Sequence, residues 1–321
     1  MVRVPGAVVR RYERFSLYNS PYPAHDHGRA IDLYPGHDTA RSPVAGEVLE
    51  RRAVRCPPKD YAVAEDHLLL VDCGDVVARI LHVEPSVQPG EVVDVGDELG
   101  TLVRSGFFGR WVDNHIHLGF RRRDQNLRRA SGSLPLELDL PVAGIPWDGT
   151  GEVIEVGPTH VLLDAPDHPG GGFAAIASDD GVPLDGGLVH YAGGGVLGSD
   201  VGVPGGGDGE NWDGDGDGVE EPEGENEGDG ANGENGDGGS RHLSLLGTPI
   251  GTVDGRDLTW RDVTWRDVAV HADGVRATGL SLFASQVPFG AKVVFHEGHD
   301  FAVGDQVQVA IEPTDESIRL G

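Results

Sequence analysis

Two short stretches of the chain carry the residues whose types and spacing best suit chemistry. The first begins at His25, includes His27 and ends on the carboxylate of Asp32. The second contains His115 and His117, separated by one residue. Because side chains on a β-strand alternate between its two faces, His115 and His117 would project from the same face.

These side chains together predict a zinc site. Two imidazole nitrogens and one carboxylate oxygen suit a borderline divalent cation such as Zn²⁺. The expected ligands are the Asp32 carboxylate and imidazoles from the two stretches. Three protein ligands leave the fourth position open, as in catalytic zinc sites. The second histidine of the pair His115 and His117 is then free to handle protons.

The charge of the chain excludes two classes of partner. Its 321 residues carry a formal net charge of -28, with 53 acidic against 25 basic side chains, and only Lys59 and Lys292 are lysines. So acidic a chain is not expected to bind nucleic acid or an anionic membrane surface. The composition resembles that of proteins from salt-loving microbes, in which high salt screens the self-repulsion.

Other features of the composition place the chain in a compartment. No run of about 18 apolar residues is present, so no membrane span is expected. The first residues lack the apolar core of a secretory signal, which predicts a cytoplasmic protein. The two cysteines, Cys56 and Cys73, imply no disulfide framework, and two reduced thiols are favoured.

The pattern of apolar residues up to residue 125 predicts an antiparallel β domain. Short alternating segments are separated by proline and glycine, and no segment shows the 3.6-residue period of a helix. The expected strands lie at 30–34, 67–71, 76–83 and around His115 and His117. Residues 42–50 predict a turn into a strand, and residues 92–100 predict a strand, a glycine turn and the start of another strand.

The rest of the chain is also expected to be β structure, which makes the fold class all-β. Residues 126–205 predict a small β unit, which could be a partial repeat of the first, and residues 240–321 predict a C-terminal β barrel or sandwich. Between them, residues 206–239 hold 13 acids and 13 glycines without lysine or arginine, which favours a disordered linker. Asp213–Gly218 is similar to a calcium loop, but Gly224 stands where the bidentate acid is needed.

The order of the motifs resembles the lysostaphin-type (LytM-like) zinc metallopeptidase domain, also called the duplicated hybrid motif, over roughly residues 20–122. A metal-binding aspartate, a Pro-Val strand, a strand with a central histidine, a Val-Gly-Asp turn and a His-x-His strand occur in this order in that family. The matching segments are Asp32, Pro43–Val48, Leu81-His82-Val83, Val95–Gly100 and His115–Leu118.

The resemblance implies a role for each matching residue. Asp32 and His117 correspond to metal ligands, His115 to the general base, and His82 to a second histidine that stabilises the transition state. It implies a Zn²⁺ cofactor, a peptide-type substrate or a protein partner, and hydrolysis of a peptide or amide bond by a metal-activated water. The alternative is a catalytically degenerate LytM-like module that binds or regulates a partner.

The chain departs from the family at the first metal ligand. The family places this histidine four residues before the aspartate, where this chain has Gly28. His27 lies five residues before Asp32 and is slightly favoured. His25 lies seven before, a spacing that resembles the D-Ala-D-Ala carboxypeptidase type of zinc peptidase. Either histidine requires a reversal of strand phase, which Gly28 could supply.

Overall fold

The computed structural model describes residues 1–198, 240–254 and 260–320, and within them the chain is nearly all β structure, as predicted. The described helix, α1 (Gly6–Val9), has four residues. The predicted linker at 206–239 and its calcium-loop alternative lie outside the described residues. None of the helical structure among the described residues is long and apolar enough to cross a bilayer.

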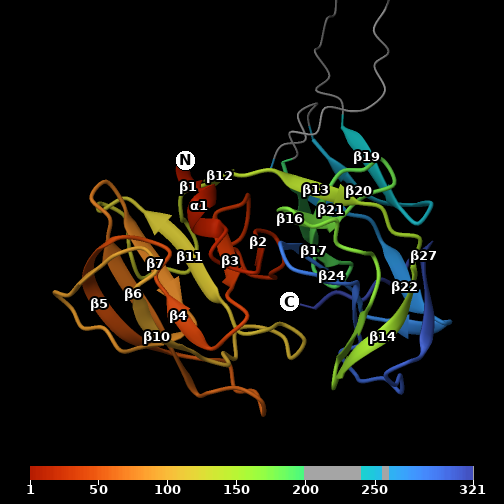
Figure 1. The fold of residues 1–321 in the computed structure, drawn as a ribbon, viewed down its shortest axis with the longest axis horizontal. Helices are drawn as coiled ribbons and strands as arrows, with labels where there is room; N and C mark the ends of the chain where they lie inside the picture. Colours follow the sequence, from red (N-terminus) through yellow and green to blue (C-terminus); the bar gives the residue numbers. More distant parts are fainter. Residues whose placement is uncertain (199–239, 255–259, 321) are drawn as a thin grey trace, which may run out of the picture.

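The sheet that carries the candidate site is built mainly by the N-terminal part of the chain (Figure 1). Its central strands, which include Ala30–Tyr34 and Ile116–Arg121, are buried on both faces, and Asp32 and His117 interrupt their largely apolar sequence. In spatial order the described strands are β13 (Val142–Ile145), β16 (Phe173–Ile176), β25 (Ala284–Ser285), β2 (Arg14–Ser16), β3 (Ala30–Tyr34), β11 (Ile116–Arg121), β7 (Val77–Leu81), β6 (Glu65–Asp72), β5 (Gly46–Arg55) and β9 (Val92–Val93).

Apolar side chains fix which face of these strands points to the core. Ile31 and Leu33 on β3, and Ile116 and Leu118 on β11, are fully buried in one hydrophobic cluster. Each such side chain contributes about 1.5–3 kcal/mol through its removal from water. Because side chains alternate, this burial forces the residues between them toward the opposite face.

The C-terminal part of the chain forms a second, larger sheet that curls into a half-barrel (Figure 1). It combines strands from residues 126–205 and 240–321, which the sequence pattern predicts as separate units. Its described strands, in spatial order, are β19 (Arg241–Leu245), β20 (Thr248–Val253), β21 (Arg261–Trp265), β18 (Gly193–Val196), β17 (Leu184–Leu188), β24 (Gly279–Leu282), β26 (Lys292–Val294), β15 (His160–Leu163), β14 (Thr150–Gly157), β27 (Gln306–Pro313), β22 (Val268–Ala272) and β23 (Val275–Ala277).

Two small sheets complete the described strands, and almost all neighbouring strands are antiparallel. The pairs β1–β12 and β13–β16 are the parallel ones among the described residues. The small sheets are β4 (Thr39–Arg41), β10 (Glu98–Leu102) and β8 (Val83–Pro85), and β1 (Val2–Pro5) with β12 (Leu136–Asp139).

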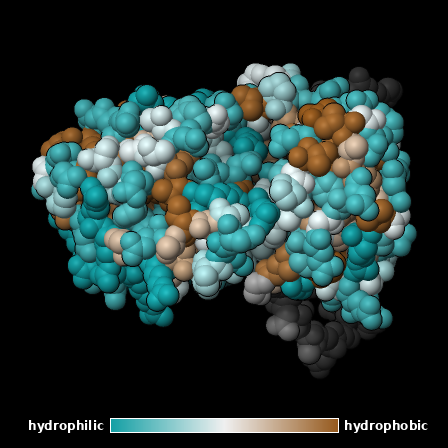
Figure 2. Space-filling view, turned by 90° about the horizontal axis from the view of Figure 1, so that it is seen from below, coloured by the Kyte–Doolittle hydropathy of each residue, from teal (hydrophilic) through white to brown (hydrophobic). Residues whose placement is uncertain are grey.

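The two halves of the molecule share a sheet. Strand β25 comes from the C-terminal part of the chain but pairs with β2 in the N-terminal sheet. The face in Figure 2 is mostly hydrophilic, with hydrophobic residues in separate small patches, as the acidic composition leads one to expect. Cys56 and Cys73 are both free.

Candidate metal centre

The strand register brings Asp32 and His117 together. The two residues lie directly opposite each other on β3 and β11, and His117 is in turn opposite Leu81 on β7. Since Ile31 and Leu33 on either side of Asp32 face the core, the Asp32 carboxylate points to the other face of the sheet, and His117 follows by the same alternation.

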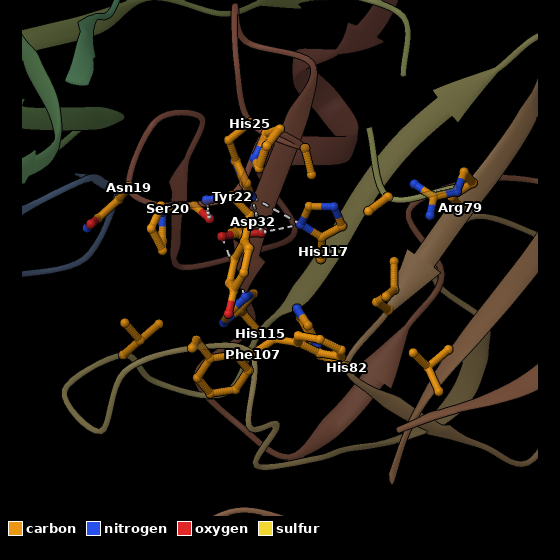
Figure 3. A pocket seen from close by; sticks show the side chains of 18 of the residues that line it. Asn19, Ser20, Tyr22, His25, Asp32, Arg79, His82, Phe107, His115 and His117 are labelled. Carbon is orange, nitrogen blue, oxygen red and sulfur yellow. Dashed lines mark hydrogen bonds and ion pairs between the residues drawn. The ribbon is translucent and has the colours of Figure 1, made fainter. Parts of the chain in front are cut away.

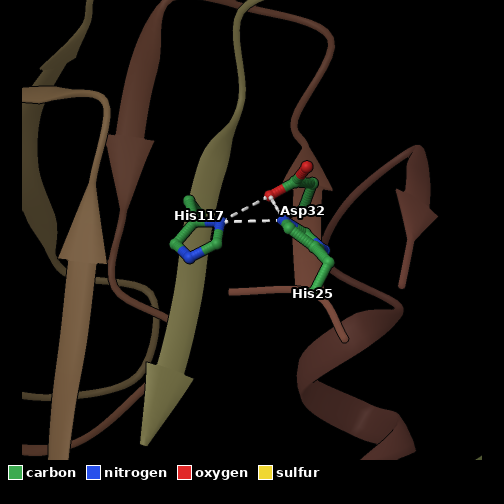
Figure 4. A group of neighbouring side chains, drawn as sticks. All are labelled: His25, Asp32 and His117. Carbon is green, nitrogen blue, oxygen red and sulfur yellow. Dashed lines mark hydrogen bonds and ion pairs between the residues drawn. The ribbon is translucent and has the colours of Figure 1, made fainter. Parts of the chain in front are cut away.

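Three side chains converge on this face from β3, β11 and the loop before β3 (Figure 4). His117 Nδ1 lies 2.9 Å from Asp32 Oδ1. His25 Nε2 lies 3.1 Å from His117 Nδ1 and 3.3 Å from Asp32 Oδ1. All three residues are buried, so they form a closed group of two imidazole nitrogens and one carboxylate oxygen that could bind a metal ion.

The three atoms lie 2.9–3.3 Å apart, slightly closer together than the ligand atoms of a zinc ion, so small shifts would admit one. A tetrahedral zinc ion at ~2.0–2.2 Å from each ligand separates neighbouring ligand atoms by roughly 3.3–3.6 Å. His25 Nδ1 lies 2.8 Å from the carbonyl oxygen of Leu17 and donates a hydrogen bond to it. In a neutral His25 this directs the Nε2 lone pair at His117 Nδ1 and Asp32 Oδ1, an arrangement that a proton on His117 Nδ1 or a bound cation would stabilise.

A tight turn explains why His25, and not His27, reaches the site. The Gly28 amide donates to the His25 carbonyl, and both His27 and Gly28 have positive φ, at 59° and 60°. Such angles suit glycine and reverse the chain direction. The His27 side chain is 67% exposed, and its Nδ1 contacts the Asp262 carboxylate instead of the group. The slight preference for His27 from the sequence therefore does not agree with the geometry.

The electrostatics of the group favour an ionised Asp32 carboxylate beside a neutral His117 imidazole. Burial lowers the pKa of His117 to about 4. Burial would raise the pKa of Asp32, but the imidazoles of His25 and His115 outweigh it and hold that pKa well below its usual range. Burial likewise opposes the charged form of His25, yet the Asp32 carboxylate raises the pKa of His25. In the metal-free protein a proton on His25 can thus stabilise the group.

His115 adjoins the group without joining it. Its Nε2 is 3.5 Å from Asp32 Oδ2, whereas its Nδ1 donates to the carbonyl oxygen of Asp113 at 2.8 Å. The Asp113 carbonyl thereby fixes the tautomer and leaves the Nε2 lone pair facing the cavity. Burial lowers the pKa of His115 to about 4, so the ring is a neutral base at pH 7.

His82 lies on the other side of the same space and is held by a carboxylate. Its ring centroid is 4.9 Å from that of His115, and its Nδ1 is 2.5 Å from Asp66 Oδ2. The backbone amide of His82 also donates to Asp66 Oδ1. His82 has a positive φ of 69°, which is unusual for a non-glycine residue. His82 therefore divides the predicted strand 76–83 into β7 and β8.

A cavity of about 290 Å³ contains all five of these side chains (Figure 3). The cavity is lined by the imidazoles, the Asp32 carboxylate and the aromatic rings of Phe107 and Phe108. Its remaining lining includes Tyr22, Tyr191 and Arg79. A group that could hold a metal therefore lies beside two further imidazoles in a space large enough for part of a ligand.

Sequence reasoning missed the residues that position this site. Asp66 orients His82, and two backbone carbonyls, those of Leu17 and Asp113, orient His25 and His115. Arg79 was also missed, although an arginine within the apolar run 76–81 was a visible signal. No local pattern marked Asp66, since its role depends on the pairing of β6 with β7.

Comparison with known proteins identifies two matching family models. The model described as "Domain of unknown function (DUF8155) N-terminal domain" matches residues 3–138. The model described as "Domain of unknown function (DUF8155) C-terminal domain" matches residues 143–312. No curated protein matches the chain. Among solved structures, the chain is similar to "NMR solution structure of lysostaphin", at 15% identity and a TM-score of 0.25, over 49% of this chain and 71% of that chain.

Proposed function

This chain belongs to the DUF8155 family, and we propose that it is a zinc-dependent hydrolase that cleaves a peptide or amide bond. One observation carries the proposal: two imidazole nitrogens and a carboxylate oxygen lie 2.9–3.3 Å apart in a buried group, next to two more imidazoles. The ligands would be His25, Asp32 and His117, and the lysostaphin-like order of motifs in the sequence agrees with this reading.

Each residue has a part that follows from its contacts. When bound, a zinc ion supplies Lewis acidity, which polarises a carbonyl group and makes a coordinated water more acidic. His115, a neutral base with Nε2 facing the cavity, accepts a proton from the attacking water. As the new C–O bond forms and the C–N bond breaks, His115 returns this proton to the leaving amine.

His82 is suited to the oxygen of the scissile carbonyl. When both of its ring nitrogens carry a proton, Nδ1–H donates to Asp66 and Nε2–H remains for the oxygen on which negative charge develops. Hydrogen-bond donors fixed in a dry site stabilise such charge more strongly than water does. The Asp66 carboxylate is buried and fixed by the His82 amide, so the ring is already oriented.

The test separates metal binding from catalysis. The purified protein should contain about one zinc ion per chain by mass spectrometry and should hydrolyse members of a mixed peptide library, with loss of activity in chelator and recovery on adding zinc. His117→Ala should abolish metal uptake, whereas His115→Ala should retain zinc and lose hydrolysis. A protein that binds zinc but cleaves nothing would instead support a binding module, and a protein that binds no zinc would refute the proposal.

A further inference from the structure

Arg79 is a buried cation in the candidate metal cavity, and no acid among the described residues forms an ion pair with it. The residue is 3% exposed, and its Nε–H donates to the carbonyl oxygen of Leu127 at 2.8 Å. Asp32 is the one acid that lines the cavity. Burial, with a contribution from Arg121, lowers the pKa of Arg79 to about 10, so the guanidinium stays charged at pH 7.

An unpaired buried charge of this kind is costly. Buried guanidinium groups are normally paired with carboxylates or phosphates, because desolvation is otherwise uncompensated. In this chain acids outnumber bases 53 to 25, yet none of the described ones pairs with Arg79. The terminal nitrogens of the Arg79 guanidinium have no hydrogen-bond partner among the described residues, and the side chain lines the cavity. An anion from outside the chain would satisfy it.

The strand register gives the distance of Arg79 from the candidate ligands. Arg79 on β7 is paired with Gly119 on β11, and Leu81, two residues further along β7, is paired with His117. Arg79 therefore projects from the same face of the sheet as His117, about 7 Å further along the strands. Figure 3 shows the same arrangement, with Arg79 beyond His117 as seen from Asp32. About 7 Å corresponds to one or two residues of extended peptide.

The segment 122–132 closes the cavity just beyond Arg79. Arg121 lies two residues further along β11 than Gly119. It is 2% exposed and donates to the carbonyl oxygens of Asn126, Arg129 and Ser131. These bonds hold the segment over the sheet, where Arg128 and Ala130 line the cavity. A polypeptide lying along the strands from His117 would meet this segment after Arg79, so little room remains for a chain that continues.

We propose that Arg79 binds the C-terminal carboxylate of a peptide substrate, so that the site removes one or two residues from a free chain end. The inference rests on the proposed hydrolase function. The planar guanidinium can pair with a carboxylate through two parallel N–H···O bonds. Water adds to the scissile carbonyl carbon, the C–N bond breaks, and the leaving amino acid or dipeptide takes the proton and keeps its carboxylate on Arg79.

The test compares N-acetylated tripeptides that differ only at the C-terminus. The zinc-loaded protein should release one or two residues from the free acids and should cleave the matching C-terminal amides at least tenfold more slowly. Arg79→Gln should lower kcat/KM for the acids tenfold to a hundredfold and leave that for the amides unchanged, because only the acids lose a charge-assisted pair. Arg3→Gln, at an exposed arginine that pairs with Asp139 and does not line the cavity, is the matched control and should change either value less than threefold.

Other results would overturn this assignment. Equal cleavage of acids and amides would refute it and leave the proposed hydrolysis intact. Preferred cleavage of amides that carry an aspartate near the scissile bond would mean that Arg79 binds a side-chain carboxylate, which would refute the C-terminal assignment. If no peptide is cleaved, calorimetry can measure how the unmodified protein binds an N-acetyl dipeptide acid and its amide. Binding of the acid alone, lost in Arg79→Gln, would support the carboxylate site. Equal binding of acid and amide would refute it. If Arg79→Gln does not fold, the acid-amide comparison on the unmodified chain gives the answer.

Discussion

Asp185 in the C-terminal sheet accepts a hydrogen bond at 2.6 Å from the backbone amide of Leu17, whose carbonyl in turn accepts from His25. Asp185 also binds the Ser16 hydroxyl and the Tyr18 amide. It is fully buried, and within the described part of the chain no other carboxylate hydrogen-bonds to Ser16, Leu17 or Tyr18. The C-terminal half of the chain therefore helps to orient the first candidate ligand, although it contributes none of the three ligand atoms.

Asp185→Ala should weaken zinc binding although Asp185 is not a ligand. Without the carboxylate, the Leu17 and Tyr18 amides lose their acceptor, and the carbonyl that orients His25 is no longer fixed. Loss of such an outer partner typically costs about tenfold to a hundredfold in metal affinity. Competition with a zinc-binding dye measures this. Asp167→Ala, at an exposed aspartate of the same half, should leave the affinity unchanged; an equal loss in both variants would refute a specific role.

His25→Ala and His27→Ala should separate the two histidines that the sequence left open. Zinc at a hundred times its Kd stabilises the folded protein by about 2.7 kcal/mol, so it should raise Tm by several degrees. The increase should disappear in His25→Ala, because one of three ligands is gone, and persist in His27→Ala, whose side chain pairs with Asp262 outside the group. Thermal scans with and without zinc measure it. Loss of the increase in His27→Ala would contradict the observed geometry.

Asp66→Asn should reduce turnover without removing the metal. The amide is nearly isosteric, but it cannot provide the negative charge that His82 Nδ1–H faces at 2.5 Å. If His82 donates to the developing oxyanion, kcat should fall about tenfold to a thousandfold while KM and zinc content stay close to those of the unmodified protein. Asp60→Asn, at an exposed aspartate paired with Arg110, is the control. A fall in zinc content that accounts for the lost activity would argue that Asp66 has only a structural role.

The sequence predicted the strands of the site because local patterns determine them. Asp32 between Ile31 and Leu33, and His117 between Ile116 and Leu118, alternate with apolar residues whose burial sets the face. This alternation was sufficient to predict that both side chains project from one face of a β-sheet. The all-β class followed from the same patterns and is confirmed by the structure.

The remaining parts of the site depend on contacts that no local pattern contains. The choice of His25 over His27 depends on a turn in which two successive residues have positive φ, and only one of them is glycine. The partner of His82 is set by the pairing of β6 with β7, and the support of Leu17 comes from Asp185, more than 160 residues away. Pairing and register of this kind are determined by the whole fold.

The pH dependence of stability should reveal His190, a buried histidine of the C-terminal half. Its ring is fully buried, packs against Trp111 and has no hydrogen-bond partner on either nitrogen among the described residues. Burial lowers its pKa to about 3. Because the unfolded chain binds this proton near pH 6.5, stability is complete above that pH and is lost as the pH falls toward 3. Protonation of His190 in the unfolded chain should by itself lower the free energy of unfolding by roughly 2–3 kcal/mol between pH 7 and 4.5.

His190→Leu should remove this part of the acid sensitivity. Leucine fills a similar volume and breaks no hydrogen bond, so the free energy of unfolding at pH 7.5 should change by less than about 1.5 kcal/mol. At pH 4.5 the variant should be more stable than the unmodified protein, because it has no imidazole to protonate on unfolding. Urea unfolding of chelator-treated protein between pH 4.5 and 7.5 measures both values. His242→Leu, at an exposed histidine, should keep the original slope, and the same slope in His190→Leu would show that the buried ring is already protonated or hydrated in the folded state.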